Sequence, residues 1–258
     1  MLSSKIDPRF MLKSTLLTFS VFIFLFACAP LPSITQAQSP KNEYVVLLHG
    51  LARYESSMRK MQKALVEQGY GTCNIAYPSR HHSIEKLTQD YVLPKVRECL
   101  ANKDAKLNFV THSLGGIIVR NLLQKEKFKN LSAVVMLSPP NQGSEVVDTL
   151  GDYWLFELIN GPGGKELGTG KKSTPNRLGP AKFKLGIITG NFSINPIFSL
   201  IIPGEDDGKV SIERAKLQGM SDFLVVPVSH PFIMKDNEVI RQTLFFLKHY
   251  RFRHNQDG

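Results

Sequence analysis

The sequence predicts an α/β fold, with a mostly parallel sheet and helices on both faces. Short apolar runs that are typical of strands alternate with longer segments whose apolar residues recur at helical spacing, and this alternation is the pattern of strand–helix–strand units. The 258 residues are 42% hydrophobic, which is enough for one sizeable core. Charged residues make up 21%, close to the share in an ordinary globular domain.

Six runs rich in Val, Leu, Ile and Phe are the expected strands. They lie at residues 43–48, 72–77, 106–111, 132–138, 185–190 and 222–228. The expected helices lie at residues 56–68, 84–101, 114–126 and 235–249. Pro94 falls inside the second helix and predicts a kink or a break there, because proline lacks the N–H group that a helix interior uses.

The first 38 residues are expected to be a targeting segment that precedes a single folded domain, residues 39–258. A few basic residues come before the apolar stretch Leu16–Ala27, which is shorter than the roughly 20 residues of a membrane span and is typical of a secretory signal. Cleavage after Ala37 is favoured. A lipoprotein-type end at Cys28 and an uncleaved membrane anchor are the alternatives. All three would place the protein outside the cytosol, in the periplasm or secreted.

Residues 150–184 interrupt the alternation of strands and helices. The segment is rich in glycine and begins with an apolar run that holds the sole tryptophan, Trp154, and Phe156. Apolar side chains of this size are costly to expose unless they cover a groove or meet lipid, and glycines supply hinge freedom. We therefore expect a mobile lid that lines an acyl pocket. The alternative is a fixed excursion that extends the core.

One run indicates the chemistry. An apolar strand-like stretch ends in Thr111-His112-Ser113-Leu114-Gly115-Gly116, and an apolar helix pattern follows. A serine at such a strand-to-helix turn holds its hydroxyl exposed, as in the nucleophile elbow Gly-x-Ser-x-Gly. Thr111 stands where the pattern has its first glycine, so a side chain would crowd the turn. The simpler interpretation of Ser113 is a helix N-cap, for which serine is also preferred.

Three further sequence runs complete the chain order serine, acid, histidine that accompanies such an elbow. A buried strand leads into His49-Gly50-Leu51, the acidic turn Pro203–Val210 lies downstream, and another strand precedes His230. With these residues the chain resembles an α/β-hydrolase of the bacterial lipase and esterase type, from Tyr44 to Tyr250 apart from the insert. His-Gly-Leu, His-Ser-x-Gly-Gly, and Asp-Gly-x-Val before a histidine carry the resemblance.

The resemblance implies the catalytic residues Ser113, Asp207 and His230. A serine hydroxyl needs a base to take its proton, and histidine, with a pKa near 6.5, is suited to this work when a carboxylate orients it. Asp206 and Glu205 are the competing acids. The competing histidines are His249 and His254, which look like surface residues. His112 is interpreted as structural. His81 and His82 are expected in a solvated loop, and a metal or substrate role is their alternative.

Further residues would complete the site. The main-chain N–H groups of Leu51 and Leu114 are expected to bind the oxyanion, since one follows His49-Gly50 and the other follows the nucleophile. Asn141 opens the run Asn141-Gln142-Gly143-Ser144, which resembles a loop that borders the pocket in lipases. The cysteines show no metal-ligand spacing, and we expect no metal and no other cofactor.

Cys73 and Cys99 are the even pair that remains when Cys28 belongs to a signal, and they are expected to form a disulfide in an exported protein. Cys73 lies near the start of a strand and Cys99 near the end of the next helix, which runs back along that strand. The alternative is two buried thiols.

Composition limits the partners. A formal net charge of +10 favours anionic membrane surfaces or acidic substrates, or it is a scattered solvated surface. No nucleic-acid-binding module is present, so no nucleic acid is expected as a partner. The leading interpretation is an exported serine carboxylic ester hydrolase that acts on lipid or acyl esters through an acyl-enzyme. The alternatives are an acyltransferase or thioesterase with the same triad, and a non-catalytic envelope binding protein.

Overall fold

The computed structural model describes residues 42–100, 104–151 and 154–254, with the side chains of residues 154–159 left out. These residues belong to one folded unit, Gln38–Gly258. The expected targeting segment, including Cys28, lies outside the described residues. The strands of the described residues are β1 (Glu43–Leu48), β2 (Gly71–Ile75), β3 (Lys106–His112), β4 (Leu131–Leu137), β5 (Leu185–Gly190) and β6 (Asp222–Val226).

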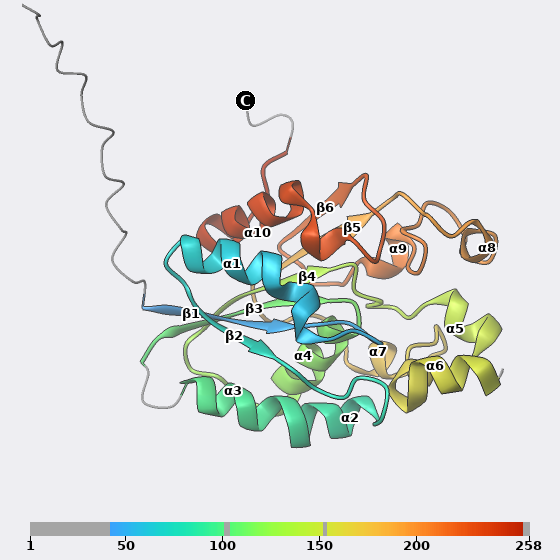
Figure 1. Cartoon of the computed structure of the whole chain (residues 1–258), viewed down its shortest axis with the longest axis horizontal. Coiled ribbons are helices and arrows are strands. Elements are labelled where there is room, and N and C mark those ends of the chain that lie inside the picture. The colour runs from blue at the N-terminus through green and yellow to red at the C-terminus, as the bar shows by residue number, and fades with distance from the viewer. Residues whose placement is uncertain (1–41, 101–103, 152–153, 255–258) are drawn as a thin grey trace, which may run out of the picture. The chain divides into compact units, whose positions relative to one another are not determined.

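The six strands form one sheet in the order β2-β1-β3-β4-β5-β6, and every neighbouring pair is parallel (Figure 1). The predicted α/β fold is therefore confirmed, and the sheet within the described residues is wholly parallel. The central strands are buried on both faces, which explains why they read as almost continuous apolar runs in the sequence. Two edge strands are shorter than expected: β2 ends at Ile75 and β6 at Val226.

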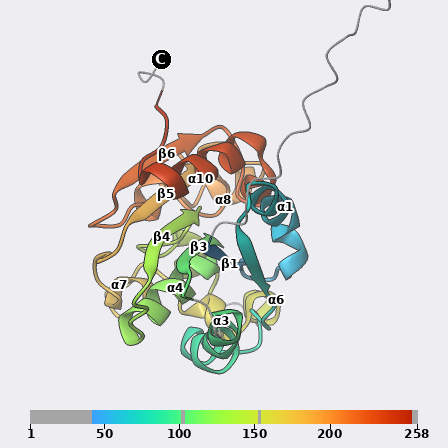
Figure 2. The ribbon, with the colours of Figure 1, turned by 90° about the vertical axis from the view of Figure 1, so that its left-hand side faces the viewer.

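Helices cover both faces of the sheet. On one face lie α1 (Arg59–Glu67) and α10 (Asn237–His249), and on the other lie α3 (Leu93–Leu100) and α4 (Leu114–Lys125), as Figures 1 and 2 show. Successive side chains of a strand point to opposite faces. In β1, Val45 therefore packs with α1 and α10, whereas Val46 packs with α3 and α4. The shorter helices are α2 (Ile84–Lys86), α5 (Glu145–Leu150), α6 (Trp154–Lys165), α7 (Thr174–Arg177), α8 (Pro196–Ser199) and α9 (Ile212–Ala215).

Pro94 affects the helix that begins at Ile84. The helical path continues from Ile84 to Leu100, but it widens into a π-helical turn, Leu87–Val92, just before the proline. Proline cannot supply an N–H to the preceding turn, and a wider turn there accommodates the lost hydrogen bond. None of the described helices has both the length and the apolar character that crossing a bilayer requires.

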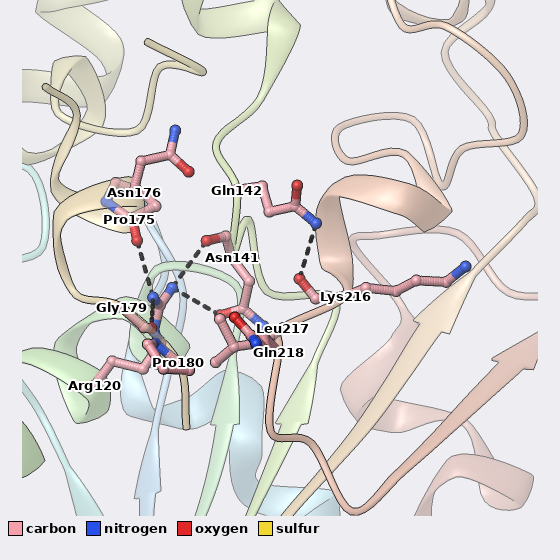
Figure 3. A pocket seen from close by; sticks show the side chains of 10 residues that line it. All are labelled: Arg120, Asn141, Gln142, Pro175, Asn176, Gly179, Pro180, Lys216, Leu217 and Gln218. Carbon is pink, nitrogen blue, oxygen red and sulfur yellow. Dashed lines mark hydrogen bonds between the residues drawn. The ribbon is translucent and has the colours of Figure 1, made fainter. Parts of the chain in front are cut away.

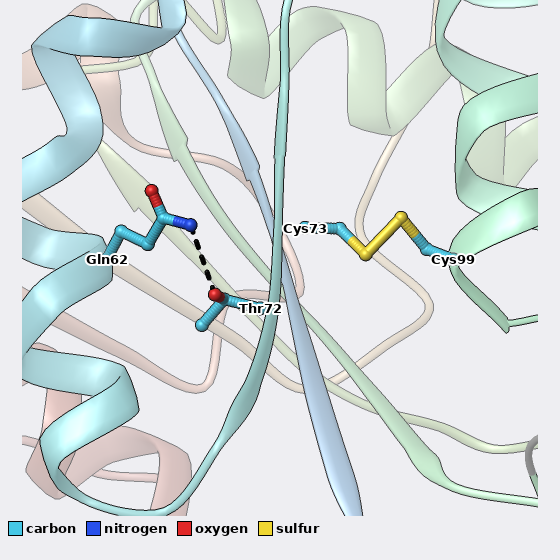
Figure 4. The surroundings of a disulfide bond; sticks show 4 residues. All are labelled: Gln62, Thr72, Cys73 and Cys99. Atoms are coloured by element: carbon cyan, nitrogen blue, oxygen red, sulfur yellow. Dashed lines mark hydrogen bonds between the residues drawn. A yellow bond between two sulfur atoms is a disulfide. The ribbon is translucent and has the colours of Figure 1, made fainter.

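The disulfide joins Cys73 of β2 to Cys99 of α3, with an S–S distance of 2.10 Å and a Cα–Cα distance of 6.3 Å. Figure 4 shows it on one side of the strand, while Thr72, the preceding residue, points to the other side. There the Thr72 hydroxyl accepts a hydrogen bond of 3.2 Å from Gln62 of α1. The edge strand β2 is thus held from both of its faces.

The insert after β4 contains α5, α6 and α7, and its second part is tied to the rest of the domain. The Glu166 carboxylate accepts hydrogen bonds from the Ile84 N–H at 2.9 Å and from the Thr174 hydroxyl at 2.6 Å. Gly161 has a φ of 64° and lies so close to Arg80 that a Cβ atom would come within 1.6 Å of the Arg80 carbonyl oxygen. This glycine therefore lets the insert pack closely against Arg80. The glycines of the insert were expected from the sequence to act as hinges instead. Trp154 and Phe156 lie in α6, and the structure does not describe their side chains.

Candidate active site

The candidate site lies at the carboxyl edge of the sheet, because all six strands are parallel and their ends meet there. Ser113 follows β3 directly, His49 follows β1, Asp207 lies in the loop after β5, and His230 lies in the loop after β6. Residues far apart in the sequence are thereby brought to one place.

Ser113 adopts a strained backbone conformation at the turn from β3 to α4, with φ 51° and ψ −120°. It stands at the N-cap position of α4, yet its hydroxyl makes no capping hydrogen bond, so the simple N-cap interpretation does not account for it. The turn is held by main-chain groups instead: the Ser113 N–H donates to the Leu137 carbonyl at 2.9 Å. At Gly115 a Cβ would lie 2.7 Å from the Leu48 carbonyl oxygen, so glycine lets α4 approach β1.

A continuous chain of hydrogen bonds connects the serine, the histidine and the aspartate. His230 Nε2 lies 3.0 Å from Ser113 Oγ, and His230 Nδ1 lies 2.8 Å from Asp207 Oδ2. The exposed fractions of Ser113, His230 and Asp207 are 8%, 4% and 0%. The Ser113 hydroxyl thus faces a histidine nitrogen in a site that is largely closed to water.

Asp207, and not its neighbours, reaches His230. Its second carboxylate oxygen, Oδ1, accepts hydrogen bonds from the main-chain N–H groups of Lys209 at 3.0 Å and Val210 at 2.9 Å. Asp206 is engaged elsewhere, since its Oδ1 accepts hydrogen bonds from the Gly208 N–H and the Ser199 hydroxyl. Glu205 is exposed.

Electrostatics favour the charged form of Asp207. Burial by itself would raise the pKa of this carboxyl, but the attraction of His230 and the hydrogen bonds from His230 and the Val210 N–H outweigh burial and lower it. A carboxylate held ionised beside a histidine ring can orient that ring and stabilise the imidazolium.

The two expected oxyanion donors lie in the turns next to Ser113. Leu114 is the first residue of α4, where main-chain N–H groups point outward from the helix end. Leu51 follows Gly50, where an added Cβ would lie 3.1 Å from the Cβ of Ser113, so this turn lies against the serine. The Ala52 N–H donates to the Ser79 hydroxyl at 3.1 Å and helps to hold the turn.

Tyr77 is a residue of this site that the sequence analysis missed. Its ring stacks on His49 with centroids 4.0 Å apart, and its hydroxyl donates a hydrogen bond to the His49 carbonyl. Burial lowers the pKa of His49 and raises that of Tyr77, so both stay neutral. The signal that could have revealed Tyr77 is its place at the end of an expected strand, on the same edge as His49.

Asn141 is brought to a separate polar cavity of about 300 Å³. Its amide Nδ2 donates to the Ala215 carbonyl at 2.9 Å, and Arg120 donates to its main-chain and side-chain oxygens. Figure 3 shows Arg120 among these acceptors, and it also donates to Pro175 and Gly179, both at 2.9 Å. Burial lowers the pKa of Arg120 to about 10. None of the three expected catalytic residues lines this cavity, and Arg120 fastens α4 to the insert.

In the part of the chain that the structure describes, no group of three or more His, Cys, Asp or Glu side chains could hold a metal ion. His82, expected in a solvated loop, stacks on Tyr91 with ring centroids 5.1 Å apart and shares a hydrogen bond of 2.8 Å with its hydroxyl. His81 is exposed, and His249 lies in α10 beside Phe245.

Comparison with known proteins places this geometry in context. Residues 38–141 match the protein family described as "Putative serine esterase (DUF676)". This stretch includes the strand before His49 and the complete Ser113 turn. No curated protein matches the chain.

Solved structures share the fold. The Bacillus licheniformis lipase BlEst2 in its mature form is 22% identical, with a TM-score of 0.64, and the match covers 85% of this chain and 96% of that one. An esterase from Pyrococcus furiosus is 18% identical, with a TM-score of 0.56, and the match covers 81% of this chain and 82% of the esterase. The type II thioesterase YbtT is 14% identical, with a TM-score of 0.56, and the match covers 83% of this chain and 96% of the thioesterase. These structures show that the chain shares the fold of these lipases and esterases, and residues 38–141 are similar to the serine esterase family.

Proposed function

We propose that the chain is an exported serine carboxylic ester hydrolase in which Ser113 is the nucleophile, His230 the general base and Asp207 the residue that orients His230. The observation that carries the proposal is the hydrogen-bonded path from Ser113 Oγ through His230 to Asp207 Oδ2, with distances of 3.0 and 2.8 Å. Both distances lie in the range that proton transfer between a nucleophile and its base requires.

The reaction follows from this arrangement. His230 Nε2 takes the Ser113 proton as the oxygen attacks the ester carbonyl, and the resulting oxyanion is stabilised by the N–H groups of Leu114 and Leu51. The imidazolium then gives its proton to the departing alcohol, which leaves an acyl group on Ser113. Water, deprotonated by His230, releases the acid and restores the serine.

A covalent label tests the assignment. A fluorophosphonate should add to the peptide that contains Ser113, and p-nitrophenyl esters of increasing chain length should be hydrolysed and should define the acyl preference. Labelling of another serine, with none at Ser113, contradicts the proposal. An acyltransferase or a thioesterase would use the same triad, so the products formed with an added alcohol acceptor, and the rates on matched oxygen esters and thioesters, distinguish these activities.

Export is supported by the disulfide between Cys73 and Cys99, because such bonds persist in oxidising compartments. Cell fractionation and N-terminal sequencing of the purified protein test it. A mature N-terminus near residue 38 supports cleavage, a lipid-modified Cys28 supports a lipoprotein, and recovery of the full chain from the cytosol contradicts export.

Association with a membrane surface is the second part of the proposal. Nine large apolar side chains are exposed in the described residues, and six of them lie on segments that follow β1, β5 and β6, at the edge that carries Ser113. The six are Tyr54, Phe192, Ile194, Ile197, Leu200 and Phe232. Ile197 and Leu200, on and directly after α8, are 69% and 88% exposed. Exposed apolar residues gathered beside a site are typical of contact with lipid.

Vesicle binding tests this surface. The double variant Ile197→Ser, Leu200→Ser should bind vesicles of anionic phospholipid less than the wild type does. Val66→Ser removes a side chain that is 54% exposed on α1 and should bind as the wild type does. Equal binding of all three proteins contradicts a membrane role for this segment.

A further inference from the structure

The turn that carries one of the two proposed oxyanion donors is held by the loop that follows β2. This turn runs from His49 to Ala52, and the loop contains Tyr77 and Ser79. The Tyr77 hydroxyl donates a hydrogen bond to the His49 carbonyl. At the other end of the turn, the Ala52 N–H donates to the Ser79 hydroxyl at 3.1 Å. Both ends of the turn are therefore bound to one loop.

The donor in this turn, the Leu51 N–H, is available to a ligand. In the part of the chain that the structure describes, this N–H forms no hydrogen bond. The turn lies against the proposed nucleophile, because a Cβ added at Gly50 would come within 2.7 Å of His112 Nδ1 and 3.1 Å of the Ser113 Cβ. A main-chain N–H without an acceptor costs free energy unless water or a ligand accepts its bond. Leu51 thus has the property that an oxyanion donor needs.

The His49 side chain fixes the direction of this N–H. Its Nδ1 lies 2.9 Å from the Gly50 carbonyl oxygen, and because a carbonyl can only accept, Nδ1 is the donor. The Gly50 carbonyl and the Leu51 N–H belong to one planar peptide group, in which they point in opposite directions. The hydrogen bond that holds the carbonyl therefore also holds the Leu51 N–H.

Tyr77 in turn holds the His49 ring. The two rings stack with an interplanar angle of 9°, and both side chains are buried. The Tyr77 N–H points to His49 Nε2, the ring nitrogen that is left to accept, with a distance of 3.5 Å between the two nitrogens. Tyr77 thus contacts His49 at its ring face, at its ring edge and at its main-chain carbonyl.

We propose that Tyr77 and Ser79 are positioning residues that keep the Leu51 N–H directed at the oxyanion. Tyr77 acts through His49, and Ser79 acts through the Ala52 N–H. The inference rests on the proposed function. Negative charge develops on the ester oxygen only as the tetrahedral intermediate forms, so a displaced donor weakens binding of the transition state more than binding of the ester. Loss of a positioning contact therefore lowers kcat and leaves KM nearly unchanged.

Removal of the Tyr77 hydroxyl tests the proposal. Tyr77→Phe keeps the stacked ring and should lower kcat on a p-nitrophenyl ester about tenfold, less than the roughly 10²–10³-fold cost of losing an oxyanion donor outright. A trifluoromethyl ketone forms an oxyanion on the catalytic serine, and its binding should weaken by the same factor while KM changes little. Ser79→Ala should change kcat and inhibitor binding in the same direction, and it decides the question if Tyr77→Phe does not fold.

Tyr70→Phe is the matched control. Tyr70 is also a buried tyrosine, and it lies directly before β2, at the opposite edge of the sheet. This variant should keep the wild-type kcat and the wild-type affinity for the inhibitor, and thermal unfolding checks that each variant is folded. An equal loss of kcat in Tyr70→Phe overturns the positioning role, as does an unchanged kcat in folded Tyr77→Phe and Ser79→Ala. A lower kcat without weaker binding of the trifluoromethyl ketone also overturns it. Hydrolysis by Ser113→Ala overturns the proposed function instead.

Discussion

His112 donates a hydrogen bond from its Nε2–H to the main-chain carbonyl of His230 at 3.1 Å, and the two imidazole rings lie 4.9 Å apart. A carbonyl oxygen can only accept, so this bond selects the tautomer of His112 with its proton on Nε2. The residue before the proposed nucleophile therefore holds the main chain of the proposed base, and it links the end of β3 to the loop after β6.

This contact leads to a prediction about pH. Burial, then His230 and Arg53, lower the pKa of His112 well below 6.5, so the folded protein keeps it neutral where the unfolded chain binds a proton. His112 then adds stability that is fully present above about pH 6.5 and is lost as the pH falls, by an amount on the order of 1 kcal/mol between pH 7.5 and pH 5.5. Urea unfolding at these two pH values measures it.

The variant His112→Asn should show a smaller difference between the two pH values than the wild type does. His81→Asn changes an exposed histidine and should show the wild-type difference. An equal difference in all three proteins would contradict a buried neutral His112.

Replacing Ser113 by Ala should reduce kcat on the order of 10⁶-fold, as removal of the nucleophile does in serine hydrolases. The physical reason is that no other hydroxyl is hydrogen-bonded to His230 in the described residues. Steady-state hydrolysis of a p-nitrophenyl ester measures the loss, and circular dichroism shows whether the variant is folded. Retention of most of the activity would mean that another group attacks the ester.

The choice between the two neighbouring aspartates can be tested directly. Asp207→Asn should lower kcat by about 10⁴-fold, the loss seen when an amide replaces the carboxylate that orients a catalytic histidine. Asp206→Asn should cost far less, because the Asp206 carboxylate binds the Gly208 N–H and the Ser199 hydroxyl and makes no hydrogen bond to His230. A greater loss at Asp206 than at Asp207 reverses the assignment.

The disulfide should stabilise the fold. Cys73 and Cys99 are separated by 26 residues, and closing a loop of this size contributes roughly 3 kcal/mol in the loop-entropy model. Cys73→Ser should lower the free energy of unfolding by about this amount, as should the double replacement of both cysteines. Mass spectrometry without reduction should recover the linked peptides. Two thiols open to alkylation in freshly purified protein would contradict the bond.

Movement of the insert stays a prediction. The hydrogen bonds of Glu166 hold the second part of residues 150–184, so a lid movement would have to centre on the first part, where Trp154 lies. Because Trp154 is the sole tryptophan, its fluorescence should shift when micelles or a covalent phosphonate are added. Trp154→Ala should change the chain-length preference. Unchanged fluorescence together with an unchanged preference in a folded variant would favour a fixed excursion.

Much of the fold could be predicted because parallel strands buried on both faces leave almost continuous apolar runs in the sequence. The same pattern locates strand ends, and so it places Ser113, His230 and the acidic turn at one edge. The finer structure depends on contacts that no local pattern encodes. One such contact is the hydrogen bond between His112 and the His230 carbonyl, and another is the bond from the Ile84 N–H to the Glu166 carboxylate. Each joins segments more than 80 residues apart.

The edge strands and the insert show the same limit. Val228 lies beyond the end of β6 because its N–H bonds to the Val226 carbonyl in a turn, although its apolar character suits a strand. Glycine richness in the insert was interpreted as freedom to move. At Gly161, however, the missing Cβ makes room for the Arg80 carbonyl, a requirement that only the folded arrangement reveals.

The backbone of Ser113 has one more consequence, for the evolution and engineering of this protein. A φ of 51° with a ψ of −120° is unfavourable for any residue with a Cβ atom and costs on the order of 1–3 kcal/mol. Glycine accepts this conformation, so Ser113→Gly should unfold at a higher temperature than the wild type while losing its activity. Selection for heat resistance alone would therefore discard the proposed nucleophile, and only selection for turnover would keep the serine in place.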